Sequence, residues 1–232
     1  MTTMTTAPLP VAGFDCETTG TDVAADRIIS AALVRRSGGE PAATRTWLID
    51  PGIAIPAEAA AIHGITTADV RAHGAPPPQA LDEIAQSLAE CLAQSLPVLI
   101  YNAPFDLRIL AAELSRHGLP TLEHRLGRAV KPVLDPLVID KGVDRYRKGS
   151  RRLPDLMRVY GVAPAAHLHD AADDVLNTIA VFDALMHTHR ELPTDPDRLH
   201  DWQVAKHREW ATHYNAWLSS KGRAPTADVV WP

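Results

Sequence analysis

The sequence has little cysteine and no long apolar run. Only Cys16 and Cys91 occur among 232 residues, and their apolar surroundings indicate buried thiols rather than a disulfide scaffold. No segment approaches the ~18 consecutive apolar residues of a transmembrane helix, and the start of the chain lacks the basic and then apolar order of a signal peptide. We therefore expect a cytoplasmic protein without a membrane partner.

An excess of basic charge is also missing. The formal charge of −5 at pH 7 argues against a generally basic nucleic-acid binder. It leaves room for an enzyme whose acids are masked by metal, because local charge decides contact with a substrate. A hydrophobic content of 46% and a charged content of 22% are ordinary for a globular protein. The length suits one α/β domain with an extension.

Strand and helix patterns follow one another along the chain. The expected strands lie at residues 11–17, 27–34, 44–49, 97–101 and 133–135. The expected helices lie at residues 79–92, 104–117, 153–160, 170–187 and 199–221, and residues 50–78 read as an irregular stretch. The first three strands have hairpin spacing and the later ones alternate with helices. This order predicts a mixed sheet with helices on both faces.

The pattern divides the chain into three parts. Residues 1–9 are expected to form a flexible tail, residues 10–190 the main domain, and residues 191–232 a helical extension packed on it. The extension carries Trp202, Trp210, Trp217 and Trp231. The spacing of the first three suits a helical stripe packed on the domain, and a partner or substrate surface is the alternative.

The first expected strand ends in two acids, Asp15 and Glu17. Residues two apart in a strand point to the same face, so the two carboxylates project together. A divalent metal relieves their repulsion, and oxygen-only ligands favour magnesium or manganese. The alternative reading is a strand end with two solvated acids.

Two later acids complete a candidate constellation. Asp106 falls in the first turn of an expected helix that follows a strand directly; an acid there also complements the helix dipole. His169 precedes another expected helix, and Asp174 follows five residues later. Asp174 borders the apolar stripe of that helix, whereas Asp173 remains a rival ligand.

These three segments resemble, in this order, the DEDDh family of 3′–5′ exonucleases. That family includes the proofreading epsilon subunit of bacterial DNA polymerase III, ribonuclease T and oligoribonuclease. The matching stretches are FDCETTG at residues 14–20, NAPFD at residues 102–106, and His169 with Asp174. Residues 62–66, IHGIT, also look like a recurrent family element. The resemblance covers roughly residues 10 to 188.

The resemblance implies a ribonuclease H-like α/β fold with a central five-stranded mixed sheet. It assigns Asp15, Glu17 and Asp174 to one metal ion, with Asp15 bridging to a second ion that Asp106 supports. The expected cofactors are two Mg²⁺, with Mn²⁺ able to substitute. His169 would be the general base, since its ordinary pKa of about 6.5 suits that task.

The resemblance and the local chemistry also suggest contacts with substrate. Small groups after the first acids would meet the terminal nucleotide, and the basic run at residues 145–152 would grip phosphates, unless it is only a solvated surface. The expected substrate-binding residues are Thr18, Thr19, Gly20, His63, Asn102, Phe105, Arg147 and Arg151.

The leading hypothesis is therefore a metal-dependent 3′–5′ exonuclease that releases nucleoside 5′-monophosphates from single-stranded DNA or RNA. The alternative is an inactive nuclease-like module that binds nucleic acid or a polymerase partner. A helical metal phosphohydrolase, suggested by the doublet of His169 and Asp170, is disfavoured by the strands before residue 102. A polymerase or repair partner and a homodimer, known among relatives, remain open.

Overall fold

The structure is a computed structural model of the chain, and it describes residues 8–37, 43–164 and 171–231. Within these ranges, five strands form a mixed sheet in the order β3-β2-β1-β4-β5. β1 is antiparallel to β2 and parallel to β4, and β5 is parallel to β4. The strands are β1 (Val11–Thr18), β2 (Ile28–Arg36), β3 (Ala43–Leu48), β4 (Val98–Leu99) and β5 (Val133–Leu134). The expected mixed sheet is confirmed.

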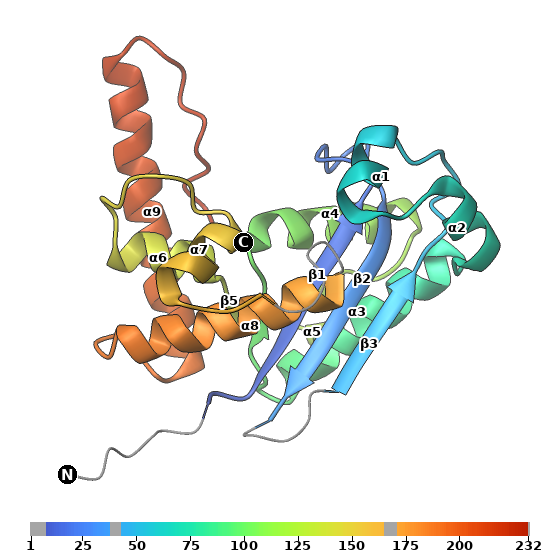
Figure 1. Cartoon of the computed structure of the whole chain (residues 1–232), viewed down its shortest axis with the longest axis horizontal. Helices are drawn as coiled ribbons and strands as arrows, with labels where there is room; N and C mark the ends of the chain where they lie inside the picture. Colours follow the sequence, from blue (N-terminus) through green and yellow to red (C-terminus); the bar gives the residue numbers. More distant parts are fainter. Residues whose placement is uncertain (1–7, 38–42, 165–170, 232) are drawn as a thin grey trace.

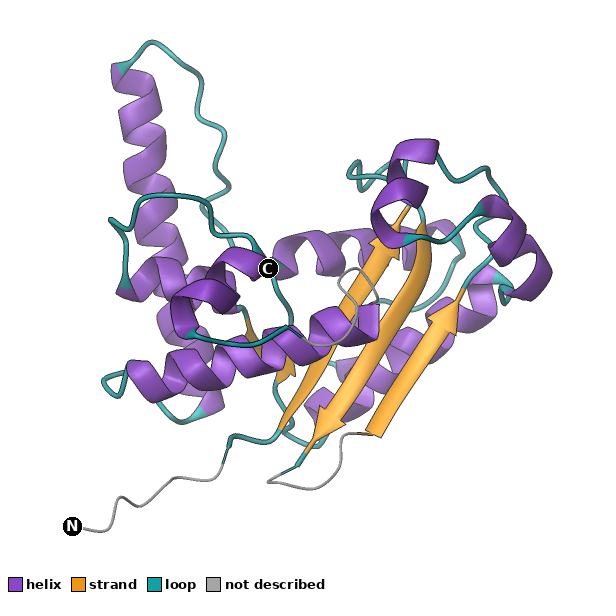
Figure 2. Cartoon of the chain, in the orientation of Figure 1, coloured by secondary structure: helices purple, strands orange, loops and turns teal. Residues whose placement is uncertain are grey.

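Helices cover both faces of this sheet (Figure 1). α3, α4 and α5 pack on one face, and α8 crosses the other (Figure 2). The helices of the described residues are α1 (Ala57–His63), α2 (Thr67–His73), α3 (Pro77–Ala93), α4 (Ala103–Arg116), α5 (Leu122–Leu126), α6 (Pro136–Val143), α7 (Leu153–Tyr160), α8 (Ala171–Thr188) and α9 (Pro196–Ser220). None of them is long and apolar enough to cross a membrane.

The stretch at residues 50–78 is not irregular, contrary to the prediction. It contains α1 and α2, each seven residues long. α2 begins with a capping box in which Thr66 and Asp69 bond to each other's backbone N–H. A helix of seven residues has less than two full turns, so its apolar periodicity is too short to recognise. In the sequence, the capping residues of α2 are its main signal. α5, with five residues, escaped prediction for the same reason, and the eight-residue α6 was also missed.

β1 divides its side chains between two cores. Ala12, Phe14 and Cys16 join the core beneath α3 and α4, while Val11 joins the core beneath α8. Because side chains alternate along a strand, Asp15 shares the α8 side with Val11. Helices cover both faces of the sheet. At the end of β1, side chains from helices on either face can approach the same strand residues.

α9 packs against the edge of the sheet. Gln203, which is fully buried, donates from Nε2 to the carbonyl of Val133 at 2.6 Å and accepts from the backbone N–H of Asp135 at 2.9 Å. The ring of His200 lies 5.5 Å from that of Trp231, which the returning chain end buries. Side chains of α9 thus bond to the edge strand β5 in place of a sixth strand.

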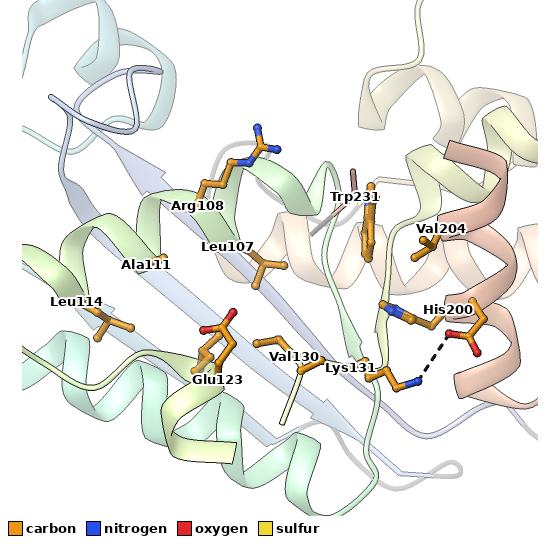
Figure 3. Close-up of a pocket in the computed structure, with 13 residues that line it drawn as sticks. Leu107, Arg108, Ala111, Leu114, Glu123, Val130, Lys131, His200, Val204 and Trp231 are labelled. Atoms are coloured by element: carbon orange, nitrogen blue, oxygen red, sulfur yellow. Dashed lines mark ion pairs between the residues drawn. The ribbon is translucent and has the colours of Figure 1, made fainter. Parts of the chain in front are cut away.

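A cavity of about 430 Å³ lies between α4, α5 and α9 (Figure 3). Leu107 and Val130 form part of its apolar wall, Trp231 and His200 lie at its α9 side, and an ion pair of 3.7 Å joins Lys131 to Asp201 beside it. The cavity lies away from the acids at the end of β1.

The expected tryptophan stripe is only partly packed. Trp202 contacts the core beneath α8, and a Cβ at Gly142 would lie 2.6 Å from its ring. Trp210 is half-buried, and Trp217 is 49% exposed. The C-terminal part of α9, which carries Trp217, projects beyond the domain because α9 is longer than the surface that it covers (Figure 1).

Replacement of Gln203 by alanine should lower the melting temperature of the whole domain. The change leaves the buried N–H of Asp135 unpaired, at about 1–3 kcal/mol. It also removes one of the two contacts to the carbonyl of Val133, where Nδ1 of His200 remains at 2.8 Å. For a chain of this size ~1 kcal/mol corresponds to ~2–4 °C. Thermal unfolding followed by circular dichroism measures the shift. Gln79→Ala, at an exposed position of α3, is the matched control. A separate early transition confined to α9 would contradict the expectation of one cooperative unit.

Candidate active site

Three carboxylates converge where β1 ends. Asp15, Glu17 and Asp174 each offer an oxygen within 4.8 Å of the others, and all three side chains are half-buried. Asp15 and Glu17 come from the same face of β1, and Asp174 comes from the first turn of α8. These are the three acids that the resemblance assigns to the first metal ion.

The approach of α8 to β1 depends on Gly13. A Cβ at this position would lie 2.5 Å from Cγ1 of Val175 and 3.1 Å from Cδ1 of Ile179. Glycine therefore lets the helix lie directly on the strand. Since Val175 follows Asp174 in the chain, this contact places Asp174 beside the acid two residues beyond Gly13.

Asp106 reaches the same strand from the other side of the sheet. It is 3% exposed, and its Oδ1 accepts hydrogen bonds from the backbone N–H of Cys16 at 3.2 Å and from Sγ of Cys16 at 3.1 Å. Cys16 lies between Asp15 and Glu17, so this pair of bonds anchors Asp106 to the acidic segment. α4 thus supplies a fourth acid behind the cluster.

The pKa values of two of these acids, Asp15 and Asp106, are raised in the folded protein. Burial, and then the charges of Asp106, Glu17 and Asp174, raise the pKa of Asp15 well above its usual value. Burial raises the pKa of Asp106 to about 7, although the hydrogen bonds from Cys16 oppose the rise. The protein alone therefore holds protons at this site near neutral pH.

Asp135 positions the helix that carries Asp106, and sequence analysis gave it no role. It is fully buried, and its carboxylate accepts from the backbone N–H groups of Asn102 at 3.1 Å and Ala103 at 3.0 Å. It also caps α6 through the N–H of Leu137 at 2.9 Å. One acid therefore joins the starts of α4 and α6. The available signal was its place as the last residue of a predicted strand, directly before a proline.

The turn after the acids is held by its own side chains. Thr18 Oγ1 donates to the carbonyl of Gly20 at 2.6 Å, and Thr19 Oγ1 donates to Asp26 at 2.8 Å. A Cβ at Gly20 would lie 2.5 Å from the carboxylate of Asp26, so a larger residue here would displace that carboxylate from its bonds to the turn. His63 ends α1, where Nδ1 accepts from the N–H of Ile65 at 3.1 Å.

The second motif begins in an unusual backbone conformation. Asn102 has φ 60° and ψ 44°, in the left-handed region, and its side chain is exposed. Phe105 packs in part against the core beneath α4. Asn102 therefore leaves a polar group at the surface, directly before the helix that bears Asp106.

The structure places Arg147 and Arg151 differently from the expectation of a phosphate grip. Both guanidinium groups contact the carboxylate of Asp140, which is fully buried and also accepts from the hydroxyl of Tyr160 at 2.9 Å. The two arginines are only 17% and 11% exposed. A buried carboxylate without a positive partner costs several kcal/mol. The two arginines therefore pair with Asp140 instead of extending into solvent.

Of the remaining predicted residues, the structure describes Asp173 but not His169 or Asp170. His169 lies outside the described residues, as does Asp170. Asp173 is half-buried and does not belong to the cluster of three acids.

The donor set suits a hard divalent cation. The described cluster consists of carboxylate oxygens only, and oxygen-only sites favour Mg²⁺, Mn²⁺ or Ca²⁺ over zinc. Burial is the largest cause of the raised pKa of Asp15, and the negative charges of Asp106, Glu17 and Asp174 add to it. The site can therefore hold a divalent metal ion.

A family model described as Exonuclease (RNase_T) matches residues 12–182. A DNA polymerase III subunit epsilon-like protein of Rhodobacter capsulatus is 32% identical over 174 residues, which cover 73% of this chain and 22% of that protein. A PolC-type DNA polymerase III of Streptococcus thermophilus is 29% identical over 155 residues, covering 66% of this chain and 10% of that protein. The chain thus spans about a fifth or less of the length of these curated relatives.

Solved structures of exonuclease I share the fold. Exonuclease I of E. coli in complex with a dA16 oligonucleotide has a TM-score of 0.67 and 22% identity, over 86% of this chain and 44% of that chain. Exonuclease I of Methylocaldum szegediense has a TM-score of 0.63 and 22% identity, over 90% of this chain and 46% of that chain. The expected ribonuclease H-like fold is confirmed.

Asp15→Asn should raise the melting temperature in EDTA, because a neutral amide removes repulsion among the buried acids. A gain of ~1 kcal/mol corresponds to ~2–4 °C. The same change should abolish most of the stabilisation that Mg²⁺ or Mn²⁺ gives to the wild type. Thermal scans with EDTA and with each metal measure both effects. Asp173→Asn is the matched control. A lower melting temperature in EDTA with metal stabilisation intact would refute the cluster as the metal site.

Stabilisation by metal should increase with pH between 5.5 and 8. In the unfolded chain an aspartate titrates near ~3.9. The pKa values of Asp15 and Asp106 are raised in the folded state, to about 7 for Asp106. At a pH between the unfolded and the folded pKa values, the folded state binds more protons than the unfolded state. The metal-free protein therefore loses stability as the pH rises through this range. Metal must displace those protons and therefore binds better at high pH. A metal-dependent shift in melting temperature that is equal at both ends of the range would contradict this assignment.

Proposed function

The chain belongs to the RNase_T exonuclease family and to its DEDDh group, and on that basis we propose that it is a metal-dependent 3′–5′ exonuclease. The reaction is hydrolysis of the terminal phosphodiester of a single strand, with release of a nucleoside 5′-monophosphate. The observation that carries the proposal is the convergence of Asp15, Glu17 and Asp174 within 4.8 Å, with Asp106 anchored to the same segment.

The acids fit a pair of Mg²⁺ ions, with Mn²⁺ able to replace them. Asp15, Glu17 and Asp174 would hold the first ion, and Asp15 and Asp106 the second. Bound in pairs, such ions activate a water and stabilise the departing oxygen in an in-line displacement at phosphorus. Two of these acids lie on one strand and two at helix starts on opposite faces of the sheet, so the fold holds them in place before any substrate binds.

His169 serves as the general base that takes the proton of the attacking water. An imidazole with a pKa near ~6.5 is suited to proton transfer at neutral pH. It precedes α8 by two residues, and α8 brings Asp174 to the cluster. Its position in the sequence, just before the helix that carries Asp174, supports this role.

The terminal nucleotide lies against the turn after β1 and the start of α4. The turn formed by Thr18, Thr19 and Gly20 has no bulky side chain, so a sugar can approach its backbone. The exposed amide of Asn102 and the ring of Phe105 would contact the nucleotide from α4, and His63 from α1. Arg147 and Arg151 contribute by holding their segment to Asp140 rather than by meeting phosphates directly.

Single-stranded DNA is the favoured substrate, because the fold neighbour with the TM-score of 0.67 is an exonuclease I in complex with a dA16 oligonucleotide. The curated relatives are polymerase proteins, which favours a polymerase partner over an isolated nuclease.

The purified protein should remove nucleotides from 3′-labelled single strands only with Mg²⁺ or Mn²⁺. His169→Ala should lower kcat by ~10²–10⁴-fold, the usual contribution of a general base, while the metal-dependent shift in melting temperature stays. Asp174→Asn should lose both activity and the metal-dependent shift. Product release on DNA and on RNA strands, resolved by gel electrophoresis, measures these changes.

Asp173→Asn serves again as the neighbouring control and should keep activity within a few-fold of the wild type. Strand binding without metal-dependent cleavage would overturn the proposal in favour of an inactive binding module. Faster cleavage of RNA than of DNA would overturn the substrate preference but not the reaction.

A further inference from the structure

An aromatic ladder runs along the outer half of α9. The rings of Trp210 and Tyr214 are 5.5 Å apart at an angle of 10°, and those of Tyr214 and Trp217 are 5.8 Å apart at 24°. Trp217 is 49% exposed and lies two turns beyond Trp210, ~10 Å along the axis. This part of α9 projects beyond the sheet and its covering helices (Figure 1). The ladder is therefore a surface feature and not part of a core.

Cations and a second exposed aromatic flank the ladder. Nζ of Lys141 lies 4.6 Å from the centre of the Trp210 ring, and the guanidinium of Arg145 lies 5.6 Å from that of Tyr146. Arg145 also pairs at 3.6 Å with Glu209, the residue before Trp210. Tyr146 is 85% exposed. Aromatic rings and positive charges thus alternate across α6, the segment after it, and α9.

The basic run at residues 145–152 divides its side chains between two directions. Arg147 and Arg151 turn inward to Asp140, while Arg145 and Tyr146 remain exposed beside α9. The run is also fixed to the second motif, because the hydroxyl of Tyr101 donates to the carbonyl of Arg151 at 2.5 Å. The exposed members therefore lie on a segment that is tied at its other end to the residue before Asn102.

We propose that this surface binds the single strand of nucleic acid upstream of the 3′ end that the acids hydrolyse. The outer face of Trp217 and the ring of Tyr146 offer stacking to bases of any sequence, and Lys141 and Arg145 offer charge to phosphates. A contiguous apolar patch that is rimmed by polar residues on a protein surface often marks an interaction site. The inference rests on the proposed function for its substrate, and the ~10 Å from Trp210 to Trp217 is enough for about two or three nucleotides.

The test compares a short with a long strand. Fluorescence anisotropy in EDTA, which prevents hydrolysis, measures the affinity of labelled trinucleotide and dodecanucleotide thymidine strands. The double variant of Trp217→Ala and Tyr146→Ala should bind the long strand about 5- to 100-fold more weakly and the short strand equally well. Its kcat/KM on a dinucleotide should match the wild type. The control is the double variant of Ile53→Ala and Val159→Ala, which removes exposed apolar side chains elsewhere.

Unchanged affinity of the double variant for the long strand would overturn the inference. So would light scattering that shows a wild-type dimer converted to monomer by the two changes, with long-strand affinity retained, because a second copy would then cover the ladder. Circular dichroism confirms that both variants fold. If the wild type cleaves nothing but the double variant still loses long-strand affinity, the proposed function fails and the binding surface stands.

Discussion

Repulsion among carboxylates at the end of β1 is the constraint on which the rest of this structure depends. Four acids are brought to one place. Burial and the charges of the other three raise the pKa of Asp15, and burial raises the pKa of Asp106. No single element could hold such a group, since each acid alone would turn to solvent. Here Asp15 and Glu17 are held by the sheet, and the other two acids by helices whose apolar faces form separate cores. The hydrophobic burial on both faces offsets the repulsion, and a divalent cation removes it.

Small features make this convergence tight. Gly13 allows α8 to touch β1, and the backbone N–H of Cys16 binds Asp106 from the opposite face. Asp135 then fixes the start of α4 by accepting from two consecutive N–H groups, and Gln203 accepts from the backbone of Asp135 itself. A chain of hydrogen bonds thus runs from α9, outside the family match, to the helix that carries Asp106. The extension is part of the scaffold of the site.

Charge is used in two ways in the same short segment. Arg147 and Arg151 neutralise the buried Asp140, which holds the segment to α6 and α7, while Arg145 and Tyr146 stay at the surface next to α9. A run of basic residues in a sequence therefore does not measure the charge available to a ligand. The net charge of −5 is compatible with strand binding because binding depends on this local arrangement.

Periodicity and turn chemistry are local properties of the chain, and they predicted the order of the strands and long helices and the mixed sheet. The four acids were candidates from their places at a strand end and at helix starts, and the resemblance to the exonuclease family joined them into one site. α8 matched residues 170–187 within one position at either end. Sequence alone missed the seven-residue helices α1 and α2, the inward turn of Arg147, and the positioning role of Asp135. Only the tertiary structure decided between Asp173 and Asp174 as members of the cluster, because that choice depends on which side of α8 meets β1. The role of Asp135 was hidden for a similar reason, since its partners lie 32 and 33 residues away in sequence and meet it only when β4 and β5 pair.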